Sequence, residues 1–133
     1  LPPEFIRILD AKVIFTATPR DSISPIVLSD INLPVDDIIA FHATPPARDP
    51  MDYDPLEINR RMVPVSVIAG SFIIAGSLRI AAQSNVPQYL ETTREVYTSV
   101  YDVTIHSPFN PNLGQFQVPY ILVRKNSVLF SSR

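Results

Sequence analysis

The residues best suited to bind a ligand lie in one short polar turn near the carboxyl end of the chain. Arg124, Lys125 and Asn126 follow one another between two apolar runs, and Arg79 lies on a separate apolar stretch that we expect beside them. Guanidinium, ammonium and amide groups bind phosphate through charge-assisted hydrogen bonds, so these four residues form the candidate binding site. The alternative is a plain polar turn whose charges keep sheet edges from pairing with other strands.

No residues are spaced for catalysis or for metal binding. The two histidines, His42 and His106, have no Asp, Glu or His partners at ligand spacing. The acidic stretch 49–54 lacks the spacing and the terminal glutamate of a calcium-binding loop. The chain has no cysteine and three glycines, which excludes thiolate chemistry and a glycine-rich phosphate loop. We therefore expect a protein that is not an enzyme and that needs no metal or cofactor.

The charge balance argues against nucleic acid as a partner. Asp and Glu together number 13 and Lys and Arg 11, which gives a net charge of −2 at pH 7. Proteins that bind nucleic acid usually carry a basic surface that neutralises phosphates. The amino end also lacks the basic and apolar segments of a secretory signal, so we expect a cytoplasmic protein.

The element that must position Arg79 is the run 62–82, MVPVSVIAGSFIIAGSLRIAA, which is the most apolar of the chain. A membrane-spanning helix needs about 20 apolar residues, and this run is long enough. Period two, however, is typical of a strand with one buried face. The large apolar residues of one parity are Phe72, Ile74, Leu78 and Ile80. With a turn at Gly70-Ser71 we predict a β-hairpin, and a segment that inserts into a membrane is the alternative.

The rest of the chain is also predicted to be β-structure. Fourteen prolines divide it into short segments, which disfavours long helices, and β-branched and aromatic residues concentrate between them. The further strands that we predict are 5–15, 25–28, 38–42, 96–105, 118–123 and 128–130. The first of these is expected to be buried on at least one face, 29–37 to be a loop, and 87–94 to form one helical turn.

An internal repeat relates the two ends of the chain. The segment 5–13 matches 97–105 position for position, and Asp10 falls against Asp102. With a shift of two residues, 25–28 falls against 119–122. Both aspartates are predicted to face solvent. The second copy begins with the apolar hairpin and the first does not, so by repeat logic the first copy lacks roughly thirty residues. Chance similarity between β-rich segments is the alternative.

The second copy, 62–133, resembles an uncharacterised bacterial family of small β proteins. The motifs of that family are a hairpin ending in Gly-x-Leu, an aromatic-Ile-x-Leu-x-Asp-Val strand and a hydrophobic-Val-basic-Asn-x-Ile ending. Here they appear as Gly76-Ser77-Leu78, 97–103 and 122–128. The amino-terminal LPPEFIRILDAKV looks like the middle of the same pattern. The likeness covers most of the chain outside the linker 43–61.

More remotely, the order of elements is similar to the Sm-like fold, a five-stranded SH3-type barrel. The resemblance implies such a barrel, and it implies an RNA-binding role for Arg79 and the basic turn. The segment 123–128 is similar to the Sm-like turn between the last two strands but lacks its glycine. The Asp-x-x-Asn loop that holds RNA bases in that family is not recognisable around 81–85. Both departures argue against RNA binding.

The predicted organisation is all-β, with three parts. Residues 1–42 form an incomplete β-repeat of about three strands, 43–61 a proline-rich acidic linker, and 62–133 a small SH3/Sm-like five-stranded barrel. Three strands cannot close a barrel and leave backbone groups unpaired at an apolar edge. The second copy within the chain, residues outside the given sequence, or strands of another chain could cover this edge, and we favour the last. We therefore expect a non-enzymatic protein-interaction or assembly module that forms homo-oligomers through strand edges. An Sm-like RNA-binding module and a membrane-associated protein are the alternatives.

Overall fold

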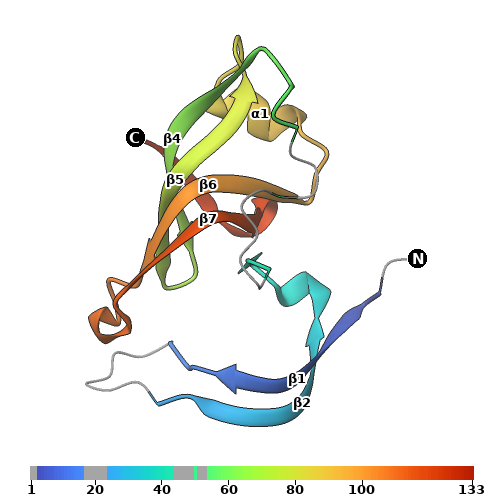
Figure 1. The fold of residues 1–133 in the computed structure, drawn as a ribbon, viewed down its shortest axis with the longest axis vertical. Coiled ribbons are helices and arrows are strands. Elements are labelled where there is room, and N and C mark those ends of the chain that lie inside the picture. The colour runs from blue at the N-terminus through green and yellow to red at the C-terminus, as the bar shows by residue number, and fades with distance from the viewer. Residues whose placement is uncertain (1–2, 17–23, 44–49, 51–53) are drawn as a thin grey trace.

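The described part of the chain folds mostly into β-strands, as predicted. The computed structural model describes residues 3–16, 24–43, 50 and 54–133 (Figure 1). Its strands are β1 (Phe5–Val13), β2 (Ile26–Pro34), β3 (Ala40–Phe41), β4 (Arg60–Ala69), β5 (Phe72–Ala81), β6 (Tyr97–His106), β7 (Gln115–Arg124) and β8 (Leu129–Ser132). The other elements are the helix α1 (Val86–Thr92) and the 3-10 turns η1 (Val35–Asp37), η2 (Pro111–Leu113) and η3 (Lys125–Ser127).

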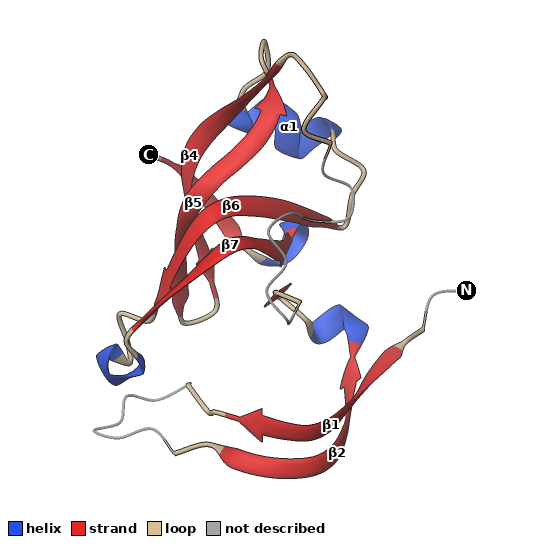
Figure 2. Cartoon of the chain, in the orientation of Figure 1, coloured by secondary structure: helices blue, strands red, loops and turns tan. Residues whose placement is uncertain are grey.

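Two antiparallel sheets make up the part of the chain that the structure describes. The larger has the strand order β3-β7-β6-β5-β4-β8, and the smaller is the hairpin β1-β2. Figure 2 shows the large sheet above and the β1-β2 hairpin below it as a separate layer. The large sheet is open, because β3 and β8 are its two edges and do not pair with each other. The all-β prediction is therefore confirmed, whereas the closed five-stranded barrel is not.

The predicted hairpin at the centre of the chain is confirmed. β4 pairs with β5 from Arg60–Ala81 to Ala69–Phe72, and Gly70 makes the turn with a φ of +59°. The side chains alternate along β5, so that Ile74, Leu78 and Ile80 are buried, as their parity predicted. The run 62–82 is thus a strand pair and not a helix. Among the described residues, no helix has the length and apolar character needed to cross a membrane.

A bulge in β6 decides which side chains of that strand reach the core. Asp102 has a φ of +53°, in the left-handed region that few side chains adopt, and the pairing of β5 with β6 changes register between Ala75 and Ser77. The extra residue shifts the alternation by one. Thr98 and Val100 are therefore buried before the bulge and Val103 after it, although Val103 has the opposite parity.

The core of the large sheet is made by side chains of β4, β5, β6 and β7 that face one another across the twisted sheet. The buried cluster consists of Val65, Val67, Ala69, Ile74, Leu78, Ile80, Val86, Val100, Val103, Ile121 and Val123. Helix α1 adds Val86 to it. Asn85 caps this helix by accepting a hydrogen bond from the Gln88 backbone N–H at 2.9 Å, and Pro87 lies in its first turn, where its missing N–H costs nothing.

Two predictions for the amino-terminal part are wrong. β2 continues through the predicted loop to Pro34, because its full length pairs with β1 and its polar residues Asp30 and Asn32 lie on an exposed face. β1 was expected to be buried on at least one face, but Ala11 is its one buried residue. The reason is that no described element forms a layer over this hairpin in the way that β4 and β5 cover β6 and β7.

Candidate functional site

Arg124, one of the four predicted binding residues, fastens the amino-terminal part to the large sheet. Its guanidinium donates to Asp36 Oδ1 at 2.8 Å and lies 5.5 Å from the centre of the Tyr97 ring. Its backbone N–H donates to the Ile39 carbonyl oxygen at 2.7 Å, which aligns β3 with β7. The side chain is 17% exposed. Arg124 is therefore engaged with this chain's own carboxylate, carbonyl and aromatic groups.

Lys125 caps the carboxyl end of helix α1. Its Nζ donates to the carbonyl oxygens of Leu90 at 3.1 Å and of Thr93 at 3.0 Å. The last carbonyls of a helix lack partners within it and carry the negative end of its dipole, so an ammonium group stabilises them. Asn126, the next residue, is exposed and lies beside a shallow pocket that Leu90 and Phe130 also line.

Arg79 holds the segment before β4 against β5. Its guanidinium donates to Glu57 Oε2 at 2.9 Å and to the carbonyl oxygens of Asp54 and Glu57 at 3.0 and 3.2 Å. Arg60 donates to the other oxygen of the same carboxylate at 2.9 Å. These two hydrogen bonds, that of Arg60 first, hold the pKa of Glu57 below its ordinary value. Arg79 is 16% exposed, so most of its surface is covered by this chain.

The four predicted residues therefore do not line one common pocket. Arg79 lies with Tyr89 and Tyr97 in a polar cleft of about 430 Å³, whereas Lys125 and Asn126 lie at another pocket. Arg79, Arg124 and Lys125 each bond to oxygen atoms of other segments of this chain and so connect those segments. Phosphate binding by these residues stays a prediction.

The histidines lie apart from any acidic cluster. His42 packs edge-on against Tyr120, with ring centres 4.9 Å apart, and His106 is half-buried at the end of β6. In the described ranges, no three or more His, Cys, Asp or Glu side chains are grouped so that they could hold a metal ion. Of the acidic stretch 49–54, only Pro50 and Asp54 belong to the described residues, so its predicted role as a solvated linker lies mostly outside them.

The amino-terminal hairpin, in which the sequence predicts an unpaired apolar edge, also exposes apolar side chains on both faces. The large apolar residues of this hairpin and its flanks that are exposed are Phe5, Ile6, Leu9, Ile14, Phe15, Ile26, Val27 and Leu28. Contiguous exposed apolar surface of this kind marks interaction sites in folded proteins.

One face of this hairpin is apolar throughout. Asp10 has a φ of +52°, so the alternation of β1 shifts by one residue there, as it does at Asp102 in β6. The cross-strand pairs on this inner face are Ile6–Leu33, Ile8–Ile31, Ala11–Leu28 and Val13–Ile26. All four pairs are apolar. The opposite face carries Arg7, which forms an exposed ion pair with Asp30 at 2.8 Å.

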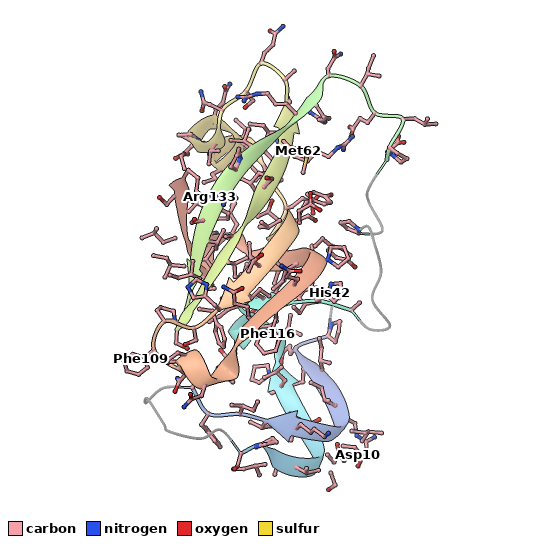
Figure 3. All side chains as sticks on the ribbon, turned by 60° about the vertical axis from the view of Figure 1, so that its left-hand side comes forward. Asp10, His42, Met62, Phe109, Phe116 and Arg133 are labelled. Carbon is pink, nitrogen blue, oxygen red and sulfur yellow. The ribbon has the colours of Figure 1, made fainter. Side chains whose placement is uncertain are left out.

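The hairpin contacts the large sheet through a few polar bonds and leaves an apolar cleft between them. Asn110 Nδ2 donates to the Thr16 carbonyl oxygen at 2.9 Å, and the Ser71 hydroxyl donates to the Thr16 hydroxyl oxygen at 3.1 Å. The cleft has a volume of about 490 Å³ and is lined by side chains that include Leu33 and Phe72. Figure 3 shows Asp10 at the end of the molecule away from Met62, with side chains of the hairpin standing free around it.

No family model matches the chain, and neither a curated protein nor a solved structure matches it.

Proposed function

We propose that this protein is a non-enzymatic interaction or assembly module, which engages protein partners, including other copies of itself, through the edges and faces of its sheets. The observation that carries the proposal is the β1-β2 hairpin. Two strands alone are marginally stable in water, and a hairpin whose inner face is apolar gains stability when another layer covers it. Leu9 and Val27, on the opposite face, are 61% and 63% exposed.

We further propose that the hairpin is an incomplete copy of an SH3/Sm-like unit, of which 60–132 is the complete one. Asp10 and Asp102 have φ values of +52° and +53°, which supports the alignment of β1 with β6. Val35 N–H donates to the Glu4 carbonyl oxygen at 2.9 Å, and Lys125 N–H donates to that of Val96 at 3.0 Å. In each unit this bond joins the first residue of the 3-10 turn to the residue immediately before the first strand, which is β1 in one unit and β6 in the other.

The pairing also corrects the alignment of the second strands. Val13 pairs with Ile26 in the hairpin, and Ile105 pairs with Phe116 in the large sheet. Ile26 therefore corresponds to Phe116 and not to Tyr120, with which the sequence comparison aligned it. With this alignment the turn η1 corresponds to η3, and β3 corresponds to β8.

RNA binding has no comparable observation in its favour. Arg79, Arg124 and Lys125 all donate to carboxylate or carbonyl oxygens of this chain. A phosphate group would have to compete with these bonds.

Sedimentation velocity over a wide range of micromolar concentrations tests the proposal. We expect species heavier than the 14.9 kDa of one chain. The double variant Leu9→Lys with Val27→Lys places charges on the exposed apolar surface and should weaken the association. Leu56→Lys, at a residue 86% exposed in the segment before β4, is the matched control and should leave it unchanged. A protein that sediments as one chain throughout, in all three forms, contradicts self-assembly.

A further inference from the structure

We propose that the free edge of β1 receives an apolar β-strand that carries a glycine opposite Asp10 and that belongs to another polypeptide. This inference rests on the proposed function and specifies its partner. In the described part of the chain, β1 pairs with β2 alone, so its other edge forms no ladder.

The way in which β5 pairs with β6 shows what kind of strand could pair with β1. Ile74 pairs with Ile105 and Ala75 with Thr104, and the pairing resumes with Ser77 and Tyr101 beyond the bulge. Gly76 lies at the break. A β-carbon at Gly76 would come within 2.6 Å of the Tyr101 carbonyl oxygen and 2.8 Å of Val100 Cγ1. The bulged edge of β6 thus accepts a strand only if a glycine lies at this position.

β1 presents the same bulge to its free edge. Between the two strands of each hairpin the pairing keeps its register past the aspartate. The pairs on either side of it are Leu9–Asp30 and Ala11–Leu28 in β1-β2, and Tyr101–Tyr120 and Val103–Val118 in β6-β7. Because the register is kept within each hairpin, the bulge of β1 and that of β6 each face the other edge of the strand, which β5 occupies in β6 and which is unpaired in β1. Leu9 and Ile8 occupy the places of Tyr101 and Val100, and an incoming strand would meet them with its glycine.

The other edges of the molecule are less suited to receive a strand. Pro34 lies on β2 at the place that Arg124 has on β7, where the Arg124 N–H donates to the carbonyl oxygen of Ile39, the residue just before β3. A proline has no N–H, so the edge of β2 lacks this donor. β8 has four residues. β1 has nine residues and no proline, and Ala11 is its one buried side chain.

The glycine requirement points away from a second copy as the occupant. The chain has three glycines. Gly76 lies in β5, whose two edges are both occupied by β4 and β6. Gly70 makes the β4–β5 turn and Gly114 follows η2, so neither lies within a strand. None of the glycines of these 133 residues is therefore placed to match the bulge of β1, and the strand that we propose comes from a different polypeptide, with apolar side chains on the face that meets Ile8 and Ile31.

The test uses a synthetic peptide with the sequence of β5, FIIAGSLRIA, added to the full 133-residue chain. The matched control is FIIGASLRIA, which has the same composition but moves the glycine by one position. We expect saturable binding of the first peptide and binding at least about tenfold weaker for the control, since overpacking of about 1.4 kcal/mol corresponds to that factor. Amide hydrogen exchange should slow in Phe5–Val13 and stay unchanged in Tyr97–His106, which shows that the peptide has not displaced the chain's own β5.

Equal binding of the two peptides, no binding, or protection confined to β2 or β8 would overturn the inference. Protection at β2 or β8 would leave the proposed function standing, because a sheet edge would still bind a strand. Self-association of the chain through β1, seen as protection of β1 that rises with protein concentration in the absence of peptide, would also replace the proposed occupant with a second copy. A chain that binds neither peptide nor itself contradicts both proposals.

Discussion

The β6–β7 pair and the β1–β2 pair have the same local design and opposite surroundings. Both are long antiparallel hairpins with a left-handed aspartate in the first strand and a 3-10 turn after the second. Thr98 and Val100 on β6 are 2% and 0% exposed, whereas Ile6, which occupies the place of Thr98 on β1, is 42% exposed. The difference lies in β4 and β5, which cover one pair and have no counterpart over the other among the described residues.

This comparison shows that an apolar pattern specifies a face and not its burial. Ile6, Ile8, Val13 and Leu28 would make a core as readily as Val100 and Val103 do, if a layer lay over them. The strand pair is connected to the large sheet by the hydrogen bonds of Thr16 and through β3, and its apolar side chains stay largely exposed.

The largest expected effect separates the two regions by stability. Leu78→Ala removes a fully buried side chain of the large sheet and should lower the free energy of unfolding by about 2–5 kcal/mol. Leu28→Ala, at a residue 42% exposed in the hairpin, should lower it by less than about 1 kcal/mol. Urea denaturation of both variants measures the difference, and equal losses would show that the hairpin belongs to a buried core.

Overpacking the β5–β6 contact should have the next largest effect. Gly76→Val places a side chain against the backbone oxygen of Tyr101 and should cost about 3 kcal/mol in the free energy of unfolding. Gly70→Asn is the control, because a side chain there meets no atom within 4 Å and asparagine tolerates the positive φ. We expect Gly70→Asn to cost less than about 1 kcal/mol. A tolerant Gly76 would remove the basis for the glycine requirement at β1.

The two aspartates sharpen the comparison further. Asp102→Val puts a β-branched residue at a φ of +53° and should destabilise the large sheet by about 2 kcal/mol, as measured by thermal or urea unfolding. Asp10→Val strains the hairpin in the same way but should leave the unfolding of the large sheet within about 0.5 kcal/mol of the original. If both substitutions lower it equally, the hairpin and the large sheet unfold as one unit.

The smallest expected effect is a pH dependence at Glu57. Its folded-state pKa lies below the ordinary 4.5, because Arg60 and Arg79 bond to its carboxylate. The stabilisation of the folded state by ionised Glu57 is therefore fully present above about pH 4.5, and it is lost as the pH falls through the lower pKa that Glu57 has in the folded state. Carbon NMR titration of Glu57 should give a midpoint below 4.5, and Arg60→Gln should move it upward. A midpoint unchanged in that variant would show that Arg60 does not hold the carboxylate.

The sequence alone predicted the features that depend on local alternation. The parity of Ile74, Leu78 and Ile80 placed the core face of β5, and the turn at Gly70 follows from its flanking runs. The match of Asp10 with Asp102 was visible as well, and both are exposed, as predicted.

Features set by partners distant in the sequence could not be predicted. The length of β2 depends on its pairing with β1, and its Asp30 reads as a loop residue until Arg7 lies opposite. Arg124 and Lys125 read as a free basic turn, because Asp36 and the carbonyl of Leu90 come beside them only in the folded chain. Period-two alternation also gave no sign that the aspartates shift the buried parity.

Residue-resolved hydrogen exchange of the chain at low concentration, without a partner, tests the central claim most directly. The amides of Val100 and Val103 in β6 should exchange only through global unfolding. The amides of β1 that point to its free edge should exchange at least about tenfold faster, through local opening. Equal protection of β1 and β6 in a single chain would contradict the account, because the hairpin would then already have its cover.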